Sequence, residues 1–263
     1  MAQRYRALFI SDVHLGTRGS RAAELLSFLK RTEAETIYLV GDIVDFWRIR
    51  RGLVWPEAHG DVLKEILRKA EAGTRVVFIP GNHDDGLRAY CGTRFGRIEV
   101  LRDTVHETAS GRRYLVMHGD EYDVVVQRAR WLALVGDRSY ALALAVNKPF
   151  NWVRGQLGLE YWSLSAYLKN RVKSCVGRIG KFETALIEAA AANAADGVIC
   201  GHIHRAASLK VGSIHYINIG DWVESCTAVV EQEDGQIEII DGVTLAPLAE
   251  SSRSGGSELE AAA

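Results

Sequence analysis

The sequence has almost no net charge and no long apolar run. Its 32 lysines and arginines balance 33 acidic residues, a formal net charge of −1, which argues against a general nucleic-acid binder. No window approaches the ~18 uninterrupted apolar residues of a membrane span. The N-terminal stretch MAQRYRALFISDVHLG lacks the apolar run of a signal peptide. We therefore expect a cytoplasmic protein that is not integral to a membrane, but that is able to sit peripherally on the cytoplasmic face of the inner membrane.

Cysteines are few and scattered. Cys91, Cys175, Cys200 and Cys226 include no C-x-x-C pair. This pattern is typical of a reduced cytosolic protein that uses cysteine as a small apolar side chain. With 263 residues, of which 48% are hydrophobic, the chain suits one large globular domain or a domain with an insertion.

Strand and helix patterns alternate along the first part of the chain. Apolar runs over Tyr5–Asp12, Thr36–Asp42 and Thr74–Asp84 predict strands, and Arg21–Arg31 and Pro56–Gly73 have helical spacing. This order is the signature of an α/β fold with parallel strands. Further strands are predicted over residues 98–109 and 112–120. A helix over 183–195 precedes a strand that ends in GHIH, and the last strands, up to residue 241, are expected to be antiparallel.

Metal-binding side chains follow five of the predicted strands, often beside glycine. Ligands in open α/β sheets bind at the carboxyl ends of the strands. Any single cluster has an ordinary explanation, such as a helix cap or a turn. Five in order, all drawn from carboxylate, imidazole and amide groups, argue for one metal centre. The clusters are Asp12 with His14, Asp42 with Asp45, Asn82 with His83 and Asp84, His118 with Asp120, and His202 with His204.

The ligand types indicate which metals fit. Carboxylate, imidazole and amide groups without thiolate suit Mn²⁺, Fe²⁺, Zn²⁺ or Mg²⁺. The set is too large for one tetrahedral ion. Two ions about 3.5–4 Å apart, bridged by one carboxylate, would use all of it.

The ordered motifs D-x-H, G-D-x-x-D, G-N-H-D, a single histidine and G-H-x-H, spread over residues 12–204, resemble those of the calcineurin-like metallophosphoesterases. The resemblance implies an α/β sandwich of two sheets flanked by helices. It also implies two divalent metal ions, with Mn²⁺ as the first choice and Fe, Zn or Mg as alternatives. It assigns one ion to Asp12, His14, Asp42 and His204, and the other to Asn82, His118, His202 and the shared Asp42.

The same resemblance implies catalytic roles. His83 corresponds to the family's general acid, and Asp84 would fix the orientation of its ring. Asp45 would support the ligands from behind. Such a centre would hydrolyse a phosphoester or phosphoanhydride, because two cations neutralise the substrate and lower the pKa of a bound water.

A narrower resemblance links the chain to the UDP-2,3-diacylglucosamine diphosphatase group, which cleaves the pyrophosphate of a nucleotide lipid in lipid A synthesis. It rests on GDIVDFW, on the tryptophan-rich segment with EYWSLSAYLKNRVK, and on NIGDWVES. The established lipid A enzymes carry an arginine where this chain has His83. The chain therefore resembles a histidine-bearing branch, whose substrate can differ.

The domain is expected over residues 1–250, with a helical insertion, or cap, at 124–182 and a disordered tail at 251–263. The insertion carries ten Lys or Arg residues against two acidic ones, about +8, interleaved with Trp131, Trp152 and Trp162. It would hold acyl chains and meet a diphosphate or an anionic membrane, unless its aromatic residues simply pack on the domain. The alternatives are a phosphodiesterase or phosphatase on a soluble substrate, and a non-catalytic metal-binding scaffold. No nucleic-acid partner is expected, and the sequence does not determine the oligomeric state.

Overall fold

The computed structural model describes residues 2–52, 54–123 and 180–248. The chain divides into two compact units, Met1–Asp120 with Leu186–Ala263, and Glu121–Ala185. Both sheets and the site described below belong to the first unit. Residues 124–179 of the predicted insertion, and the predicted tail, lie outside the described residues, so both stay predictions.

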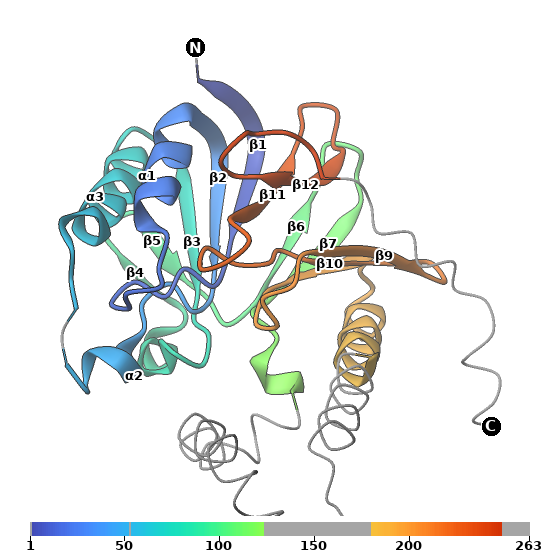
Figure 1. The fold of residues 1–263 in the computed structure, drawn as a ribbon. Helices are drawn as coiled ribbons and strands as arrows, with labels where there is room; N and C mark the ends of the chain where they lie inside the picture. The colour runs from blue at the N-terminus through green and yellow to red at the C-terminus, as the bar shows by residue number, and fades with distance from the viewer. Residues whose placement is uncertain (1, 53, 124–179, 249–263) are drawn as a thin grey trace, which may run out of the picture. The chain divides into compact units, whose positions relative to one another are not determined.

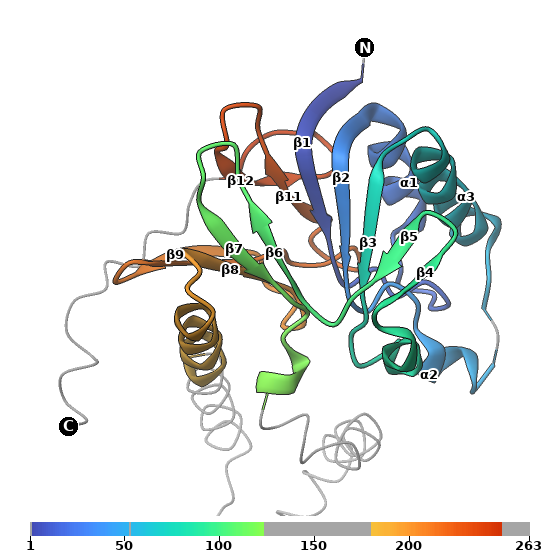
Figure 2. The same cartoon turned by 180° about the vertical axis from the view of Figure 1, so that it is seen from behind.

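The first sheet has seven strands in the order β12-β11-β1-β2-β3-β5-β4. Its central strands β1, β2, β3 and β5 are parallel, and β11, β12 and β4 run antiparallel to their neighbours. Figures 1 and 2 show β1, β2 and β3 side by side in the middle of this sheet. The strands are β1 (Gln3–Ile10), β2 (Thr32–Val40), β3 (Arg75–Ile79), β4 (Thr93–Phe95), β5 (Ile98–Val100), β11 (Thr227–Glu231) and β12 (Ile237–Asp241).

The second sheet has five strands in the order β6-β7-β8-β10-β9. β7, β8 and β10 are parallel, and β6 and β9 are antiparallel edges. The parallel pairing of β10 with β8 corrects the expectation that all closing strands are antiparallel. The strands are β6 (Thr104–Glu107), β7 (Arg113–Val116), β8 (Gly197–Cys200), β9 (Ala207–Val211) and β10 (Ile214–Asn218).

The helices lie in the connections between strands. α1 (Ala22–Arg31) joins β1 to β2, and α3 (Glu57–Glu71) follows the single turn α2 (Phe46–Ile49) on the way to β3. Two 3-10 turns, η1 (Asp85–Tyr90) and η2 (Asp120–Tyr122), follow β3 and β7. Residues 180–192 are helical and lead into β8. The helices expected over residues 21–31, 56–73 and 183–195 are therefore confirmed to within a few residues.

Alternation along the central strands builds two cores. Leu8 and Ile10 of β1 pack with α1 and α3, whereas Ala7 and Phe9 belong to a second cluster that includes residues of both sheets. β2 and β3 divide their side chains in the same way, because successive residues of a strand point to opposite faces. Helices on one face and a second sheet on the other give the expected α/β architecture of two mixed sheets with flanking helices. No helix within the described ranges is long and apolar enough to cross a membrane.

Candidate metal centre

Loops at the carboxyl ends of β1, β2, β3, β7 and β8 carry the predicted ligands. Five of these ligands have a positive φ, between 51° and 73°, although none is glycine. Such backbone is costly for residues with a Cβ and concentrates at functional sites. The strained residues are Asp12, His14, Asp42, His202 and His204.

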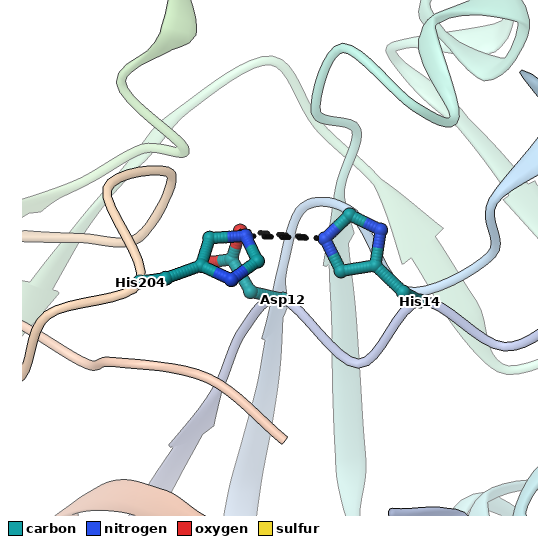
Figure 3. A group of neighbouring side chains, drawn as sticks. All are labelled: Asp12, His14 and His204. Atoms are coloured by element: carbon teal, nitrogen blue, oxygen red, sulfur yellow. Dashed lines mark hydrogen bonds and ion pairs between the residues drawn. The ribbon is translucent and has the colours of Figure 1, made fainter. Parts of the chain in front are cut away.

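The first group joins Asp12, His14 and His204. The Nε2 atoms of His14 and His204 lie 3.2 Å apart and face each other, with the Asp12 carboxylate beside them (Figure 3). Asp12 Oδ1 is 3.1 Å from His204 Nε2 and 3.9 Å from His14 Nε2. One atom from each side chain lies within 4.8 Å of the others, which is close enough to surround one ion.

The second group joins Asp42, His118 and His202, again with ligand atoms within 4.8 Å of one another. Asp42 Oδ2 is 3.5 Å from His118 Nε2 and 3.9 Å from Nε2 of His14 in the first group. Asp42 therefore stands between the two groups, as a bridging carboxylate must.

Three predicted ligand atoms are buried and make no hydrogen bond of regular geometry: Asp12 Oδ1, Asn82 Oδ1 and His118 Nε2. Asp12 Oδ1 and His118 Nε2 have only close contacts within the centre itself, to His204 and Asp42. Buried polar atoms in native proteins are nearly always satisfied. An unpaired acceptor is costly unless a cation completes it. These three atoms belong to both predicted ion sites, so the residues present fit a binuclear centre of hard or borderline cations. The identity of the metal does not follow from them.

Hydrogen bonds on the far side of the rings leave the correct nitrogen for a metal. Nδ1 of His118 is 3.0 Å from the carbonyl oxygen of Val40, and Nδ1 of His14 is 3.2 Å from Oδ2 of Asp45. A ring that donates from Nδ1 presents the lone pair of Nε2, the arrangement usual for metal-bound histidine. Both Nε2 atoms face the centre described above.

The centre is electrostatically prepared for positive charge. Burial raises the pKa values of Asp12 and Asp42, but the neighbouring imidazoles outweigh it and hold both carboxyl groups below their ordinary range. Burial lowers the pKa of His118, yet the Asp42 carboxylate raises it to about 10. The lowered pKa values of the carboxyl groups and the raised pKa of His118 have one cause, because buried carboxylates and nearby imidazolium groups stabilise each other. A bound metal ion would supply the positive charge in place of the proton.

His83 lies beside the two groups, and it forms a further group with His14 and Asp45 whose ligand atoms also lie within 4.8 Å of one another. Its ring packs against Trp47, with centroids 4.3 Å apart, and meets the edge of His14 at 4.6 Å. Its Nδ1 is 3.0 Å from Oδ2 of Asp45. Burial lowers the pKa of His83, but Asp45 and Asp42 raise it above its ordinary value.

Asp84 does not contact the His83 ring, so its predicted orienting role falls to Asp45. Its carboxylate is fully buried and accepts hydrogen bonds from backbone N–H groups. Oδ1 accepts from Gly81 at 2.6 Å, and Oδ2 accepts from Ile43 at 2.8 Å. Asp84 therefore ties the loop after β3 to the loop after β2, which carries Asp42.

Sequence reasoning missed two contributors. Ser11 Oγ donates to Asp12 Oδ2 at 2.6 Å and fixes the outer oxygen of that ligand. Trp47 covers the His83 ring, and its place at the end of the stretch GDIVDFW was the signal for it. Gly81 is also required, because a Cβ there would collide with the Asp42 carboxylate and the His118 ring.

A cavity of about 720 Å³ opens beside the centre. His14, His83 and His204 contribute to its wall, together with Asp45. The site therefore has room for a ligand larger than one phosphate group.

A family model, calcineurin-like phosphoesterase, matches residues 5–206 of the chain. The chain belongs to the calcineurin-like phosphoesterases. The matched segment spans all five ligand-bearing loops, so this phosphoesterase carries its His and Asp clusters where the motifs predicted them.

Several curated relatives of this calcineurin-like phosphoesterase share one name. A UDP-2,3-diacylglucosamine hydrolase of Neisseria meningitidis serogroup B is 28% identical over 250 residues, covering 92% of this chain and 98% of the relative. A UDP-2,3-diacylglucosamine hydrolase of Xanthomonas campestris pv. campestris is 28% identical over 246 residues, covering 87% and 96%. Among solved structures, a phosphoesterase from E. coli aligns with a TM-score of 0.47 and 14% identity, covering 92% of this chain and 96% of that one.

Proposed function

We propose that this phosphoesterase uses two divalent cations, Mn²⁺ by preference, to hydrolyse the diphosphate of a nucleotide lipid resembling UDP-2,3-diacylglucosamine. The main observation in favour of the two-metal reaction is that two groups of ligand atoms gather around Asp42, with three buried atoms, on Asp12, Asn82 and His118, that make no regular hydrogen bond. The substrate class is supported by the name that the curated relatives share.

The ligands divide between two ions. Asp12, His14 and His204 would hold one, Asn82, His118 and His202 the other, and Asp42 would join them. When bound, two divalent cations supply charge neutralisation for a phosphoryl group and activate a water nucleophile. The strained loops keep these side chains in place before substrate arrives, so little reorganisation is needed during the reaction.

His83 would act as the proton donor to the leaving oxygen. Although burial lowers the pKa of His83, Asp45 and Asp42 raise it above its ordinary value, which favours the protonated imidazole that a general acid requires. Asp45 would hold Nδ1, which leaves Nε2 as the donating atom. Nε2 lies 3.9 Å from Oδ2 of the bridging Asp42, so the donor stands beside the reacting group without being a ligand.

The lipid part of the proposal rests on the predicted insertion at 124–182. Its excess of about +8 and its tryptophans suit acyl chains, a diphosphate and the anionic surface of the inner membrane. Each buried CH₂ of an acyl chain contributes about 0.8 kcal/mol. The enzyme would then work in the cytoplasm, at the inner face of the membrane.

The test is a pair of substrates with the same UDP-sugar head, one diacylated and one bare. We expect kcat/KM to favour the acylated substrate by several orders of magnitude, with UMP released. Deletion of residues 124–182 should erase this preference while bis(p-nitrophenyl) phosphate is still hydrolysed. Equal rates on both UDP-sugars would refute the lipid substrate and leave a phosphodiesterase for soluble substrates.

A further inference from the structure

Three arginines line the cavity beside the metal centre, and the ligand set does not use them. Arg18, Arg48 and Arg51 share this cavity with His14, His83 and His204. All three arginines are exposed, and no described residue pairs with their side chains. Apart from Asp45, which is engaged by two histidines, the lining contains no carboxylate.

The backbone of Arg48 is tied to a residue of the centre. Its backbone N–H donates to Asp45 Oδ1 at 2.8 Å, so Asp45 begins α2 and holds the rings of His14 and His83 with its other oxygen. Arg51 closes the turn after α2, because its N–H donates to the Arg48 carbonyl at 2.9 Å. The backbone positions of the two arginines are therefore set by the same turn that Asp45 begins.

Arg18 reaches the same cavity from the loop after β1. This loop packs on α2 at Gly16, which has φ +101° and where a Cβ would lie 2.7 Å from Ile49 Cγ1. The loop is also tied to α3, since Gly16 N–H donates to Nδ1 of buried His59 at 3.0 Å. Two segments separated by about thirty residues thus bring arginines to the same cavity.

We propose that Arg18, Arg48 and Arg51 form an anion subsite that receives the second, non-reacting phosphate of a diphosphate substrate. The proposal rests on the phosphoesterase function proposed above, and it narrows the substrates to those with two neighbouring phosphates. A single phosphate would be neutralised by the two cations alone and would leave three arginines unused. Guanidinium groups suit a second phosphate, because their fork of donors matches its oxygens.

The proposal is tested first by binding, with uridine 5′-(α,β-methylene)diphosphate, which cannot be hydrolysed, against UMP. Both are titrated calorimetrically into Mn²⁺-reconstituted full-length protein at constant free Mn²⁺. The wild type should prefer the diphosphate analogue. The triple variant Arg18→Gln, Arg48→Gln, Arg51→Gln should bind the analogue roughly 10- to 100-fold more weakly and UMP within about twofold of wild type.

The matched control is Arg50→Gln, an exposed arginine beside the same helix that does not line the cavity. It should bind both ligands as the wild type does. If the triple variant does not fold, the single variant Arg48→Gln is compared with the wild type instead. We expect it to lose less affinity for the diphosphate analogue than the triple variant would. Equal weakening of both ligands, or a preference that survives in the variants, overturns the subsite.

Turnover separates this proposal from the function on which it rests. With bis(p-nitrophenyl) phosphate, which has one phosphate, we expect the triple variant to keep kcat and KM within about twofold, whereas KM for a UDP-sugar substrate rises roughly 10- to 100-fold. Suppose that the wild type hydrolyses neither substrate but prefers the diphosphate analogue in the binding experiment, and that the triple variant lacks this preference. The subsite then stands and the phosphoesterase function fails. If turnover of both substrates is unaffected in the triple variant, the function stands and the subsite fails.

Discussion

Oδ2 of Asp45 lies 3.0 Å from Nδ1 of His83. The same oxygen is 3.2 Å from Nδ1 of the ligand His14, and Oδ1 of Asp45 accepts the N–H of Arg48. One buried carboxylate thus joins the proposed proton donor, a proposed metal ligand and the helix that carries the proposed anion subsite. Burial raises the pKa of Asp45, but His14 and His83 lower it below its ordinary value, so the carboxylate is ionised.

Asp45→Asn should therefore impair catalysis without emptying the metal centre. The amide keeps the shape but removes the charge that supports both rings, and such supporting residues are typically worth about 10- to 100-fold. We expect kcat to fall by this amount while the metal content stays near that of wild type. Elemental analysis beside steady-state kinetics checks both, and an unchanged kcat would show that Asp45 does not position His83.

His83→Ala should keep its metals and lose most of its turnover. General acid catalysis typically contributes about 10²- to 10⁴-fold, so kcat should fall by that factor with a poor leaving group. The loss should shrink for a p-nitrophenyl ester, whose leaving group needs no proton. Losses of the same size for both substrates would count against the proton-donor role.

The number of metal ions bound by each variant should depend on whether the replaced residue is predicted to hold one ion or to bridge both. Wild type reconstituted with Mn²⁺ should hold two ions per chain, Asn82→Ala should keep one, and Asp42→Ala should keep neither tightly. Inductively coupled plasma mass spectrometry after desalting measures this, with Asp61→Ala on the surface of α3 as the control. One ion or fewer in an active wild type would contradict a two-metal site.

Asp84 should matter for stability rather than proton transfer. Asp84→Asn turns an amide group toward backbone N–H donors, which leaves at least one buried donor unpaired. We expect the free energy of unfolding to fall by about 1–3 kcal/mol. Urea denaturation measures the loss, and Asp61→Asn, whose exposed ion pair with Lys64 is worth little, should change less than about 1 kcal/mol. An Asp84→Asn variant that is as stable as the wild type but has a low kcat would instead support the predicted role of Asp84 in orienting His83.

A buried histidine far from the ligand loops should make stability depend on pH. His106 Nε2 lies 2.8 Å from Glu231 Oε2, and its Nδ1 is 3.1 Å from the Tyr38 hydroxyl. A neutral ring satisfies both partners, and burial lowers the pKa of His106. Because an unfolded histidine binds a proton near pH 6.5, the unfolded chain gains more protons as pH falls through that value, and the folded state loses stability.

The comparison is wild type against His106→Gln, by urea denaturation at pH 8 and pH 5.5. The glutamine does not titrate, so the variant should be less stable at pH 8 but lose less stability on acidification. Equal losses in both proteins would show that His106 does not contribute to the pH dependence.

Much of the fold could be predicted, because local patterns specify it. The apolar runs of β1, β2 and β3 predicted strands, which the structure buries on both faces, and Pro56 and Gly73 bracketed α3 correctly. The edge strands β4 and β9 were missed, because their exposed or half-buried residues give no apolar run. The parallel pairing of β10 with β8 was also not predicted, because the sequence of β10 does not specify which strand lies beside it.

The sequence by itself predicted the side chains that the structure gathers into the two groups around Asp42. Each ligand stands at the carboxyl end of a strand, and parallel strands deliver their ends to one edge of a sheet. Only the tertiary structure decided which carboxylate contacts which ring. Asp45 rather than Asp84 contacts the His83 ring, and Asp84 accepts hydrogen bonds from backbone N–H groups. It also brought Arg18 to the cavity of Arg48 and Arg51. These contacts depend on how loops that are far apart in the sequence come together in space, in strained backbone conformations. No local sequence pattern specifies which loops will be neighbours.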